Sequence, residues 1–226
     1  MTESPELPPY ARAAHRIETP RLILRSLQVD DAAAFTQVYS NPLNSPFGGA
    51  VGNKRTEAEQ RANIEKQALS TARGENAWLV VILKPDQVGA SSNESDLKQL
   101  RVHDGFVIGS AGFNMFHVVP ESATLLSDIG ALIDYRFHRR ALAMETLQAV
   151  IEYGFSVLGV TVFTLETNAE NVPFRALMER LGVPIEKITE GGRGHGEEGD
   201  EASYRFGLDE WKVMKQNLIA NSKWYL

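Results

Sequence analysis

Residues 127 to 182 alternate between two patterns, and this alternation constrains the fold more than any other feature of the chain. A strand is expected at Ser127 to Asp134, and a second at Thr161 to Thr167, which is rich in β-branched and aromatic residues. Between them, apolar residues recur at spacings of three and four, as on one face of a helix: Met144, Leu147, Ile151, Phe155 and Leu158. Gly159 follows where a helix end is expected.

A second helix is expected to follow Asn171, with Pro173 in its first turn and Gly182 at its end. The order strand, helix, strand, helix predicts parallel neighbouring strands joined by a right-handed crossover. In such units, ligands collect at the carboxyl ends of the strands and at the N-terminus of the crossover helix. That terminus is the stretch from His138 to Ala143, where free backbone N–H groups and two arginines predict an anion cradle.

The stretch SDIGALIDYRFHRRALAMETLQAVIEYGF resembles the central motif of the GNAT acyl-CoA N-acyltransferases, in particular the branch that acetylates ribosomal-protein N-termini. TNAENVPFRALMERLG is similar to the second motif of that branch. IETPRLILRSLQVDDAAAF resembles its first strand and helix, and SYRFGLDEWKVMK its last strand. The likeness spans residues 17 to 215. It implies an α/β fold with a GNAT-like mixed sheet of about seven strands, flanked by helices and containing a splayed parallel strand pair. A single domain is expected over residues 17 to 226, after a flexible tail at residues 1 to 16.

The chain departs from the family pattern in two places. The family's pyrophosphate loop reads Gln/Arg-x-x-Gly-x-Gly/Ala, where this chain has His138, Ala141 and Ala143; a left-handed conformation at Ala141 costs more than at glycine. The family's usual serine in the second motif corresponds to Phe174. The tyrosine that many members use as general acid corresponds to Met178, which cannot donate a proton.

The resemblance implies an N-acetyltransferase that moves an acetyl group from acetyl-CoA to an amine by direct attack in a ternary complex. Pantetheine contacts, with one N–H as oxyanion donor, are implied for Ala131, Leu132 and Ile133. Pyrophosphate contacts are implied for His138, Arg139, Arg140, Ala141, Leu142 and Ala143. Asn171 is expected to contact pantetheine and Arg175 the nucleotide phosphate. Asn171 could instead cap its helix, and Arg139 and Arg140 could be solvated charges.

The attacking amine must lose a proton, because an alkylamine with a pKa of about 10.4 is mostly charged at neutral pH. Asp128, where this branch often carries an acidic residue, is the first candidate base, and Glu166 is the reserve. Alternatively, Asp128 caps a turn or pairs with an arginine. The general acid stays open; Tyr135 is one candidate, with packing as its alternative role. An impaired GNAT-fold module that binds CoA or another protein is the alternative function.

The composition of the chain excludes several classes of function. The 226 residues include no cysteine, which fits a reducing, cytoplasmic setting and excludes disulfides and thiol nucleophiles. A net charge of −6 argues against nucleic-acid binding, and no apolar run reaches membrane-spanning length. His117 and His138 lack metal-ligand spacing. We expect no metal, a small-molecule or peptide amine as acceptor, and a monomer or homodimer.

The rest of the chain is expected to supply further strands and helices. Strands are expected at Arg21 to Leu27, Ala77 to Leu83, Phe106 to Phe116 with a bulge or a bend, Ile185 to Ile188, and Ala202 to Leu208. Helices are expected to start at Asp30, at Thr56 with Glu59 completing a capping box, and at Asp209. Residues 41 to 53 are expected to form a loop, and residues 191 to 201 a mobile hairpin connection. Residues 84 to 104 are expected to be a long connection that is either functional or disordered, with disorder favoured.

Overall fold

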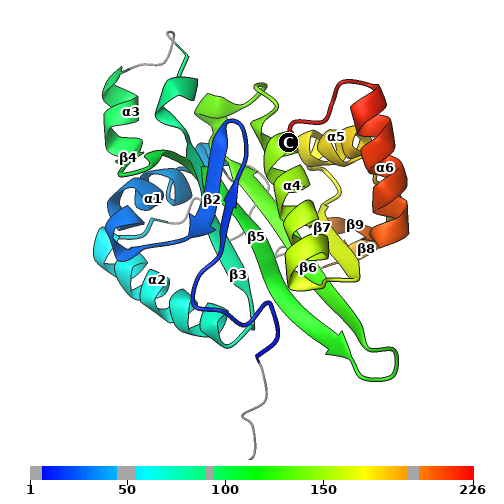
Figure 1. The fold of residues 1–226 in the computed structure, drawn as a ribbon. Coiled ribbons are helices and arrows are strands. Elements are labelled where there is room, and N and C mark those ends of the chain that lie inside the picture. The colour runs from blue at the N-terminus through cyan, green and yellow to red at the C-terminus, as the bar shows by residue number, and fades with distance from the viewer. Residues whose placement is uncertain (1–6, 45–53, 90–93, 193–198) are drawn as a thin grey trace, which may run out of the picture.

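The computed structural model describes residues 7–44, 54–89, 94–192 and 199–226, and one mixed sheet runs through it (Figure 1). The sheet has nine strands, in the spatial order β1-β2-β3-β5-β6-β7-β9-β8, with β4 paired to β5. The strands are β1 (Arg16–Glu18), β2 (Leu22–Ser26), β3 (Ala77–Leu83), β4 (Arg101–Val102), β5 (Gly105–Val119), β6 (Thr124–Ile133), β7 (Val162–Asn168), β8 (Ile185–Gly192) and β9 (Gly199–Gly207). The expected number was about seven; the short β1 and β4 account for the difference.

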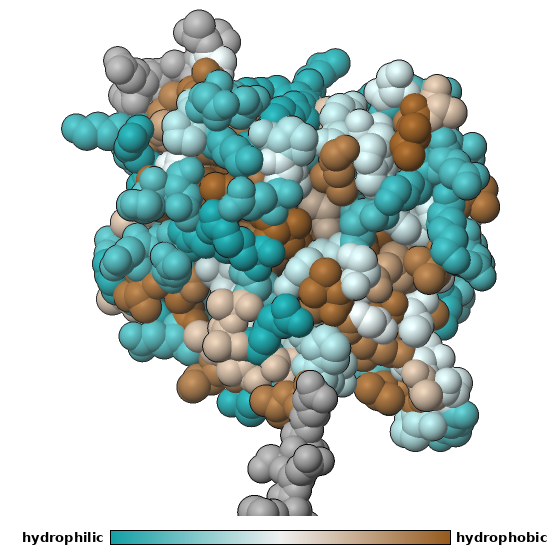
Figure 2. Space-filling model, viewed as in Figure 1, coloured by the Kyte–Doolittle hydropathy of each residue, from teal (hydrophilic) through white to brown (hydrophobic). Residues whose placement is uncertain are grey.

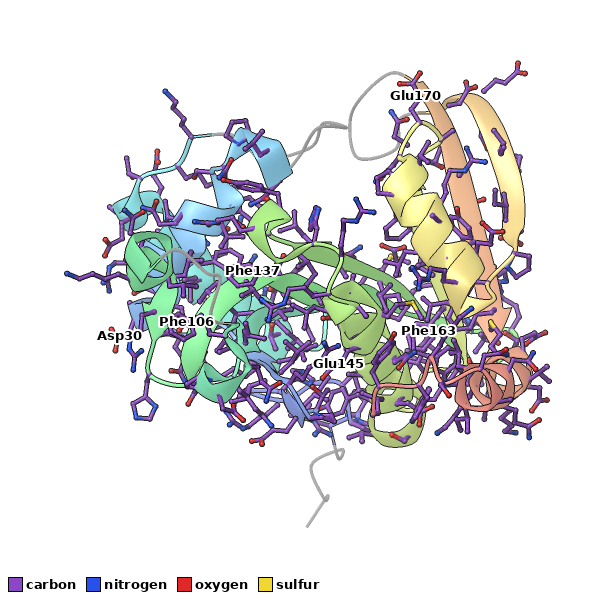
Figure 3. The ribbon with its side chains drawn as sticks, turned by 90° about the horizontal axis from the view of Figure 1, so that it is seen from above. Asp30, Phe106, Phe137, Glu145, Phe163 and Glu170 are labelled. Carbon is purple, nitrogen blue, oxygen red and sulfur yellow. The ribbon has the colours of Figure 1, made fainter. Side chains whose placement is uncertain are left out.

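Helices cover both faces of the sheet. They are α1 (Ala32–Tyr39), α2 (Glu57–Ala72), α3 (Glu94–Leu100), α4 (Leu142–Tyr153), α5 (Val172–Leu181) and α6 (Leu208–Ala220). Helices α1 and α2 lie on one face, over the N-terminal strands, and α4 lies on the other face, against β1, β5 and β6 (Figures 1 and 3). Helix α6 packs against β9. The predicted α/β architecture with a parallel β6–β7 pair is confirmed.

The predicted helix ends at Thr56, Gly159 and Gly182 are confirmed. Thr56 Oγ1 accepts a hydrogen bond from the Glu59 N–H at 3.2 Å, and Glu59 Oε2 accepts one from the Thr56 N–H at 2.7 Å. After α4 the chain makes one wider helical turn, Gly154–Leu158, which ends at the left-handed Gly159 with φ of 75°. Helix α5 ends at Gly182, also left-handed, with φ of 86°. Glycine adopts this conformation without a steric penalty.

Two local predictions are wrong. Disorder was expected over residues 84 to 104, but residues 94–102 form α3 and β4, and Leu100 is fully buried in the core. The segment looked disordered because its few apolar residues show no periodicity over so short a helix. Asp209 is not the cap of the last helix: Gly207 is, and Asp209 lies in the first turn, where a carboxylate also interacts favourably with the helix dipole. Residues 45–53, 90–93 and 193–198, which include parts of two expected loops, lie outside the described residues.

The N-terminal stretch packs against the domain from Tyr10 onward. Ala11 and His15 are buried, and the Tyr10 ring stacks on Phe116 with 4.9 Å between centroids. Among the described residues, no helix has the length and apolar character needed to cross a bilayer. On the face shown in Figure 2, apolar side chains are interspersed with hydrophilic ones.

Candidate active site

The parallel strands β6 and β7 are paired over only a short part of their length. Their register runs from Leu126–Val162 to Asp128–Thr164 and stops there. Beyond that point β6 stays paired with β5 up to Ile133, and β7 stays paired with β9 up to Asn168. The two strands therefore diverge, because each follows its antiparallel partner, and a gap opens toward their carboxyl ends. We call the last paired position, at Asp128 and Thr164, the fork.

Backbone groups of β6 face this gap. The Asp134 N–H donates a hydrogen bond to the Ile108 carbonyl of β5 at 2.7 Å. Since alternate residues of an antiparallel strand point to the same neighbour, Leu132 also points to β5, and Ala131 and Ile133 point into the gap. His138 Nε2 lies 2.7 Å from the Ile133 carbonyl oxygen. Of the three predicted pantetheine contacts, Ala131 is therefore the one whose N–H and C=O both face the gap without a hydrogen-bond partner among the described residues.

Asp128 lies at the fork and is held there by the two adjoining strands. The Asn114 side-chain amide donates a hydrogen bond to Asp128 Oδ2, and Thr164 Oγ1 donates one to Asp128 Oδ1 at 3.4 Å. Asn114 reaches Asp128 because the β5–β6 register shifts between Phe113 and Met115, leaving Asn114 in a bulge. The sequence predicted a bulge in this strand but did not single out Asn114.

The reserve base, Glu166, lies two residues beyond the fork on β7 and is exposed. The Phe163 ring packs against Gly154 at the end of α4, so Phe163 faces that helix. By strand alternation, Thr164 and Glu166 point to the opposite face of the sheet. Asp128, bonded to Thr164, shares that face. The two candidate bases therefore lie on the same side of the sheet, away from α4.

The predicted anion cradle, residues 138 to 143, has an unusual backbone. Arg139 and Ala141 are both left-handed, with φ of 61° and 58°. Ala141 is the N-cap of α4, so the first-turn N–H groups that follow have no partner within the helix. A left-handed conformation costs an L-residue roughly 1–2 kcal/mol, and the surrounding structure must hold such residues in place. The chain thus adopts here, with alanine, the geometry for which glycine is better suited.

Comparison with known proteins decides the family. A family model described as Acetyltransferase (GNAT) domain matches residues 21–183. The chain belongs to the GNAT acetyltransferase family. A curated relative, the uncharacterized N-acetyltransferase p20 of Bacillus licheniformis, is 24% identical over 173 residues, which are 75% of this chain and 83% of the relative.

Solved structures of GNAT acetyltransferases share the fold at low sequence identity. RimJ of Mycobacterium smegmatis, in complex with a CoA disulfide, matches with a TM-score of 0.70 and 14% identity, covering 97% of this chain and 100% of that one. RimL, a ribosomal alpha-N-protein acetyltransferase in complex with coenzyme A, matches with a TM-score of 0.67 and 15% identity, covering 86% of this chain and 99% of that one. The expected likeness to the ribosomal-protein branch is therefore confirmed at the level of the fold.

The other predicted cofactor contacts of this GNAT domain make bonds within the protein. Asn171 Oδ1 accepts from the Phe174 N–H at 3.2 Å, as a helix cap does, and Asn171 Nδ2 donates to Thr167 Oγ1 at 3.0 Å. Arg175 Nη1 donates to the Ala169 carbonyl at 2.9 Å. Arg140 Nη2 donates to the Gln87 carbonyl at 2.7 Å. Arg139, by contrast, is exposed at the cradle.

No acid replaces the family tyrosine at its position. Met178 is fully buried, and Phe174 packs edge-on against Tyr204 with ring centroids 6.3 Å apart. Tyr135 is 40% exposed, and the Arg136 guanidinium lies over its ring at 5.7 Å. The positions that diverge from the family motif therefore serve packing.

A buried carboxylate fixes the end of β6. Asp134 accepts hydrogen bonds from Arg136 Nε at 2.7 Å and from Asn44 Nδ2 at 2.9 Å. Burial by itself raises the pKa of Asp134, but the hydrogen bonds from Arg136 and Asn44 outweigh it and hold the pKa below its usual value. Asn44 also accepts from the Tyr135 N–H at 2.8 Å. The turn after α1 is thereby tied to the segment that leads into the cradle.

Two hollows in the protein surface lie away from the fork. One hollow, of about 460 Å³, lies between the β1–β2 turn and the outer side of α4, and another, of about 350 Å³, lies between residues 13–16 and α2. Neither is lined by the fork. Across the described ranges, no three His, Asp or Glu side chains are grouped as a metal site requires.

Proposed function

We propose that this GNAT acetyltransferase transfers an acetyl group from acetyl-CoA to an amine by direct attack in a ternary complex. The observation that carries the proposal is the unpaired stretch of β6 beyond the fork, which leads directly into the first-turn N–H groups of α4. The crystal structures of RimJ and RimL with CoA support it, because this chain shares their fold.

The residues around the gap fit such a donor. The backbone of Ala131 offers one N–H and one C=O at the unpaired edge, which suits the amide groups of pantetheine. At the cradle, the N–H groups of Ala141, Leu142 and Ala143 suit a diphosphate, since orphan N–H groups and the helix dipole favour anions. Arg139 adds an exposed positive charge beside them. When bound, acetyl-CoA supplies an acyl group already activated as a thioester.

Asp128 is the proposed general base. Its carboxylate accepts the proton of the attacking amine, directly or through one water, as the amine nitrogen bonds to the acetyl carbon and the thioester carbon–sulfur bond breaks. The sulfur leaves as a thiolate with the electron pair of that bond. A free thiol has a pKa of about 8.5, so this leaving group departs without an acid. The replacement of the family tyrosine by the buried Met178 is therefore compatible with turnover.

The acceptor is proposed to approach from the face of the sheet opposite α4, where Asp128, Thr164 and Glu166 lie. Two carboxylates on one face favour a cationic amine. A primary amine on a peptide or on a small molecule fits this description. We keep both acceptor classes in the test below, because each presents the same reacting nitrogen.

A thiol-release assay tests the proposal. The protein is incubated with acetyl-CoA and a panel of peptide N-termini, polyamines and amino sugars, and amine-dependent release of free thiol is expected for at least one class. CoA binding without release across the panel would favour the alternative, an impaired CoA-binding module. A ligand at 100 times its Kd adds about 2.7 kcal/mol to stability. Absence of any thermal stabilisation by saturating CoA would therefore rule out both.

A further inference from the structure

Arg21, in the turn between β1 and β2, contacts the anion cradle from the side of the sheet. Its Nη1 donates a hydrogen bond to the Arg140 carbonyl at 2.9 Å. Arg140 is the residue between the two left-handed residues, Arg139 and Ala141. The Arg140 side chain is fixed as well, through its bond to the Gln87 carbonyl. The backbone carbonyl and the side chain of Arg140 are therefore both held by residues outside the cradle.

Arg21 is itself held by a buried carboxylate of α4. Its Nε lies 2.5 Å from Glu145 Oε2, and its backbone N–H donates to Glu145 Oε1 at 3.0 Å. Thr19 Oγ1 donates to the same Oε1 at 2.6 Å. The Glu145 side chain is 0% exposed, among the side chains packed beside α4 (Figure 3). Glu145 lies four residues after Ala141, so Arg21 bridges the first turn of α4 to the cradle carbonyl.

The Arg21–Glu145 ion pair contributes more to the position of the turn at Arg140 than to the stability of the fold. Burying two charges costs free energy that their attraction roughly offsets, and apolar replacements of similar volume are often as stable. The position of Glu145 near a helix N-terminus is favourable on its own. What an apolar pair could not provide is the hydrogen bond to the Arg140 carbonyl, which fixes the turn between two strained residues.

The C-terminal segment completes the support. The Arg21 guanidinium lies over the Tyr225 ring at 5.5 Å. The Tyr225 N–H donates to Gln148 Oε1 at 2.9 Å, and Gln148 Nε2 donates to the Lys223 carbonyl at 2.8 Å. Gln148 is fully buried on α4, three residues after Glu145. The tail is thus tied to the helix and covers the arginine that contacts the cradle.

We infer that Arg21 is a positioning residue for diphosphate binding. It holds the Arg140 carbonyl, keeps Arg139 and Ala141 left-handed, and so keeps the N–H groups at the start of α4 directed at one point. Without this bond, the turn can relax to right-handed conformations that cost less, and the N–H groups diverge. The inference rests on the proposed function, because it concerns the cradle for the CoA diphosphate.

Arg21→Lys is the test variant. A lysine ammonium can keep the ion pair with Glu145, but it lacks the planar fork that reaches Glu145 and Arg140 together. We expect the Kd for CoA, measured by calorimetry, to rise roughly tenfold or more, as hydrogen bonds involving charged groups contribute that much. The kcat/KM for acetyl-CoA should fall by the same factor. The kcat/KM for S-acetylpantetheine, which has no diphosphate, should not change.

Arg25→Lys is the matched control. Arg25 of β2 forms a comparable ion pair with Asp31, with 2.6 Å between Nη1 and Oδ2; the Arg25 side chain is 6% exposed, against 27% for Arg21. This pair lies away from the cradle. The same chemical change there should lower the melting temperature and leave the CoA affinity unaltered. If Arg21→Lys fails to fold, the double variant Arg21→Met, Glu145→Met removes both charges and should show the same selective loss.

The outcomes separate the inference from the function. Equal losses with acetyl-CoA and S-acetylpantetheine would show that Arg21 is merely structural, and unchanged CoA affinity would show that the cradle does not depend on it; either result overturns the inference alone. A wild-type protein that does not bind CoA overturns the proposed function and the inference together, and is seen before any variant is made.

Discussion

The two sides of strand β6 behave differently. Toward β5, the strand is paired from Gly109–Ile133 to Val119–Thr124. Toward β7, it is paired only from Leu126–Val162 to Asp128–Thr164. Buried backbone N–H and C=O groups without a partner are costly. One side of the same strand therefore builds the fold, while the other keeps polar groups available that a bound molecule can satisfy.

The contrast has identifiable causes. Strand β7 follows β9 through Asn168, and β6 follows β5 through Ile133, so each strand is drawn toward its antiparallel partner. The bulge at Asn114 increases the local twist of β5 at the level of the fork. Parallel pairing is also slightly less stable per residue than antiparallel pairing. The fork lies where the weaker ladder gives way, and Asp128 is fixed at that point.

The largest expected effect comes from removing one N–H on the open side of β6. In Ala131→Pro, the lost N–H faces the gap, so the β5 ladder should survive; proline is tolerated where its missing N–H is not part of a ladder. The ring also fills space at the gap. We expect acetyl transfer to fall by up to about 1000-fold, by analogy with the loss of a catalytic hydrogen-bond donor, while circular dichroism still shows a folded protein.

Leu132→Pro is the matched change on the closed side. Its N–H points to β5, so its loss breaks the central ladder, and we expect an unfolded or strongly destabilised protein. If Leu132→Pro folds and Ala131→Pro does not, the assignment of open and closed sides is reversed. The two variants differ by one position along the strand, so composition cannot account for a difference between them.

Asp128→Asn separates chemistry from binding at the fork. An asparagine can keep hydrogen bonds to Asn114 and Thr164 but cannot accept the amine proton. We expect kcat to fall by about a hundredfold or more, which is typical for loss of a general base, with the Kd for CoA unchanged. Thr164→Val, which removes only a 3.4 Å contact to Asp128, should cost less than tenfold. Equal kcat values for Asp128→Asn and the wild type would make Asp128 structural.

Local chemistry made most of the fold predictable. The capping box at Thr56, the glycines at 159 and 182, and the strand at Ala77 to Leu83 are each specified by a few neighbouring residues. The failure over residues 94–102 has the opposite cause. Leu100 becomes buried only through long-range packing, and no periodicity in so polar a segment could reveal it.

The backbone arrangement of the candidate site was predictable from the sequence, but the side chains that hold it in place were not. The parallel strand pair and the cradle follow from the order of elements, and the cost of Ala141 follows from its left-handed conformation. Asn114 and Arg21 act from elements distant in sequence, so spacing could not connect them to the site. One signal was available: Glu145 lies between Met144 and Leu147 of the apolar helix face, and a buried carboxylate needs a partner.

The buried side chain of His15 predicts that the free energy of unfolding depends on pH. Burial, and then the charge of Arg12, lower the pKa of His15 to about 4, while an unfolded histidine titrates near 6.5. As the pH falls from about 6.5 to 4, the unfolded state takes up a proton that the folded state does not, so stability decreases through this window. After allowance for solvent screening, we expect a loss of roughly 2–3 kcal/mol.

Urea unfolding of the wild type and of His15→Gln, at pH 7 and at pH 4, measures this loss. Glutamine does not titrate but can keep a hydrogen bond to the Tyr153 hydroxyl, which lies 3.1 Å from His15 Nδ1. The loss of stability between the two pH values should be smaller in the variant. Identical losses in both proteins would mean that His15 is not the group responsible. CoA affinity at pH 7 should be the same in both, because His15 contacts Tyr153, at the opposite end of α4 from the cradle.

The smallest expected effect is that of replacing two left-handed alanines by glycine. Ala141 in the cradle and Ala123 in the β5–β6 turn are both left-handed, with φ of 58° and 52°. Substitution by glycine should relieve roughly 1–2 kcal/mol of steric cost and lose part of that gain to the greater freedom of the unfolded chain, for a net stabilisation of about 0.5–1 kcal/mol. Since the backbone already adopts the required geometry, CoA affinity should change less than about twofold in either variant. Destabilisation by Ala141→Gly, with stabilisation by Ala123→Gly, would show that the cradle is not left-handed in solution. The N–H groups proposed to bind the diphosphate would then point elsewhere.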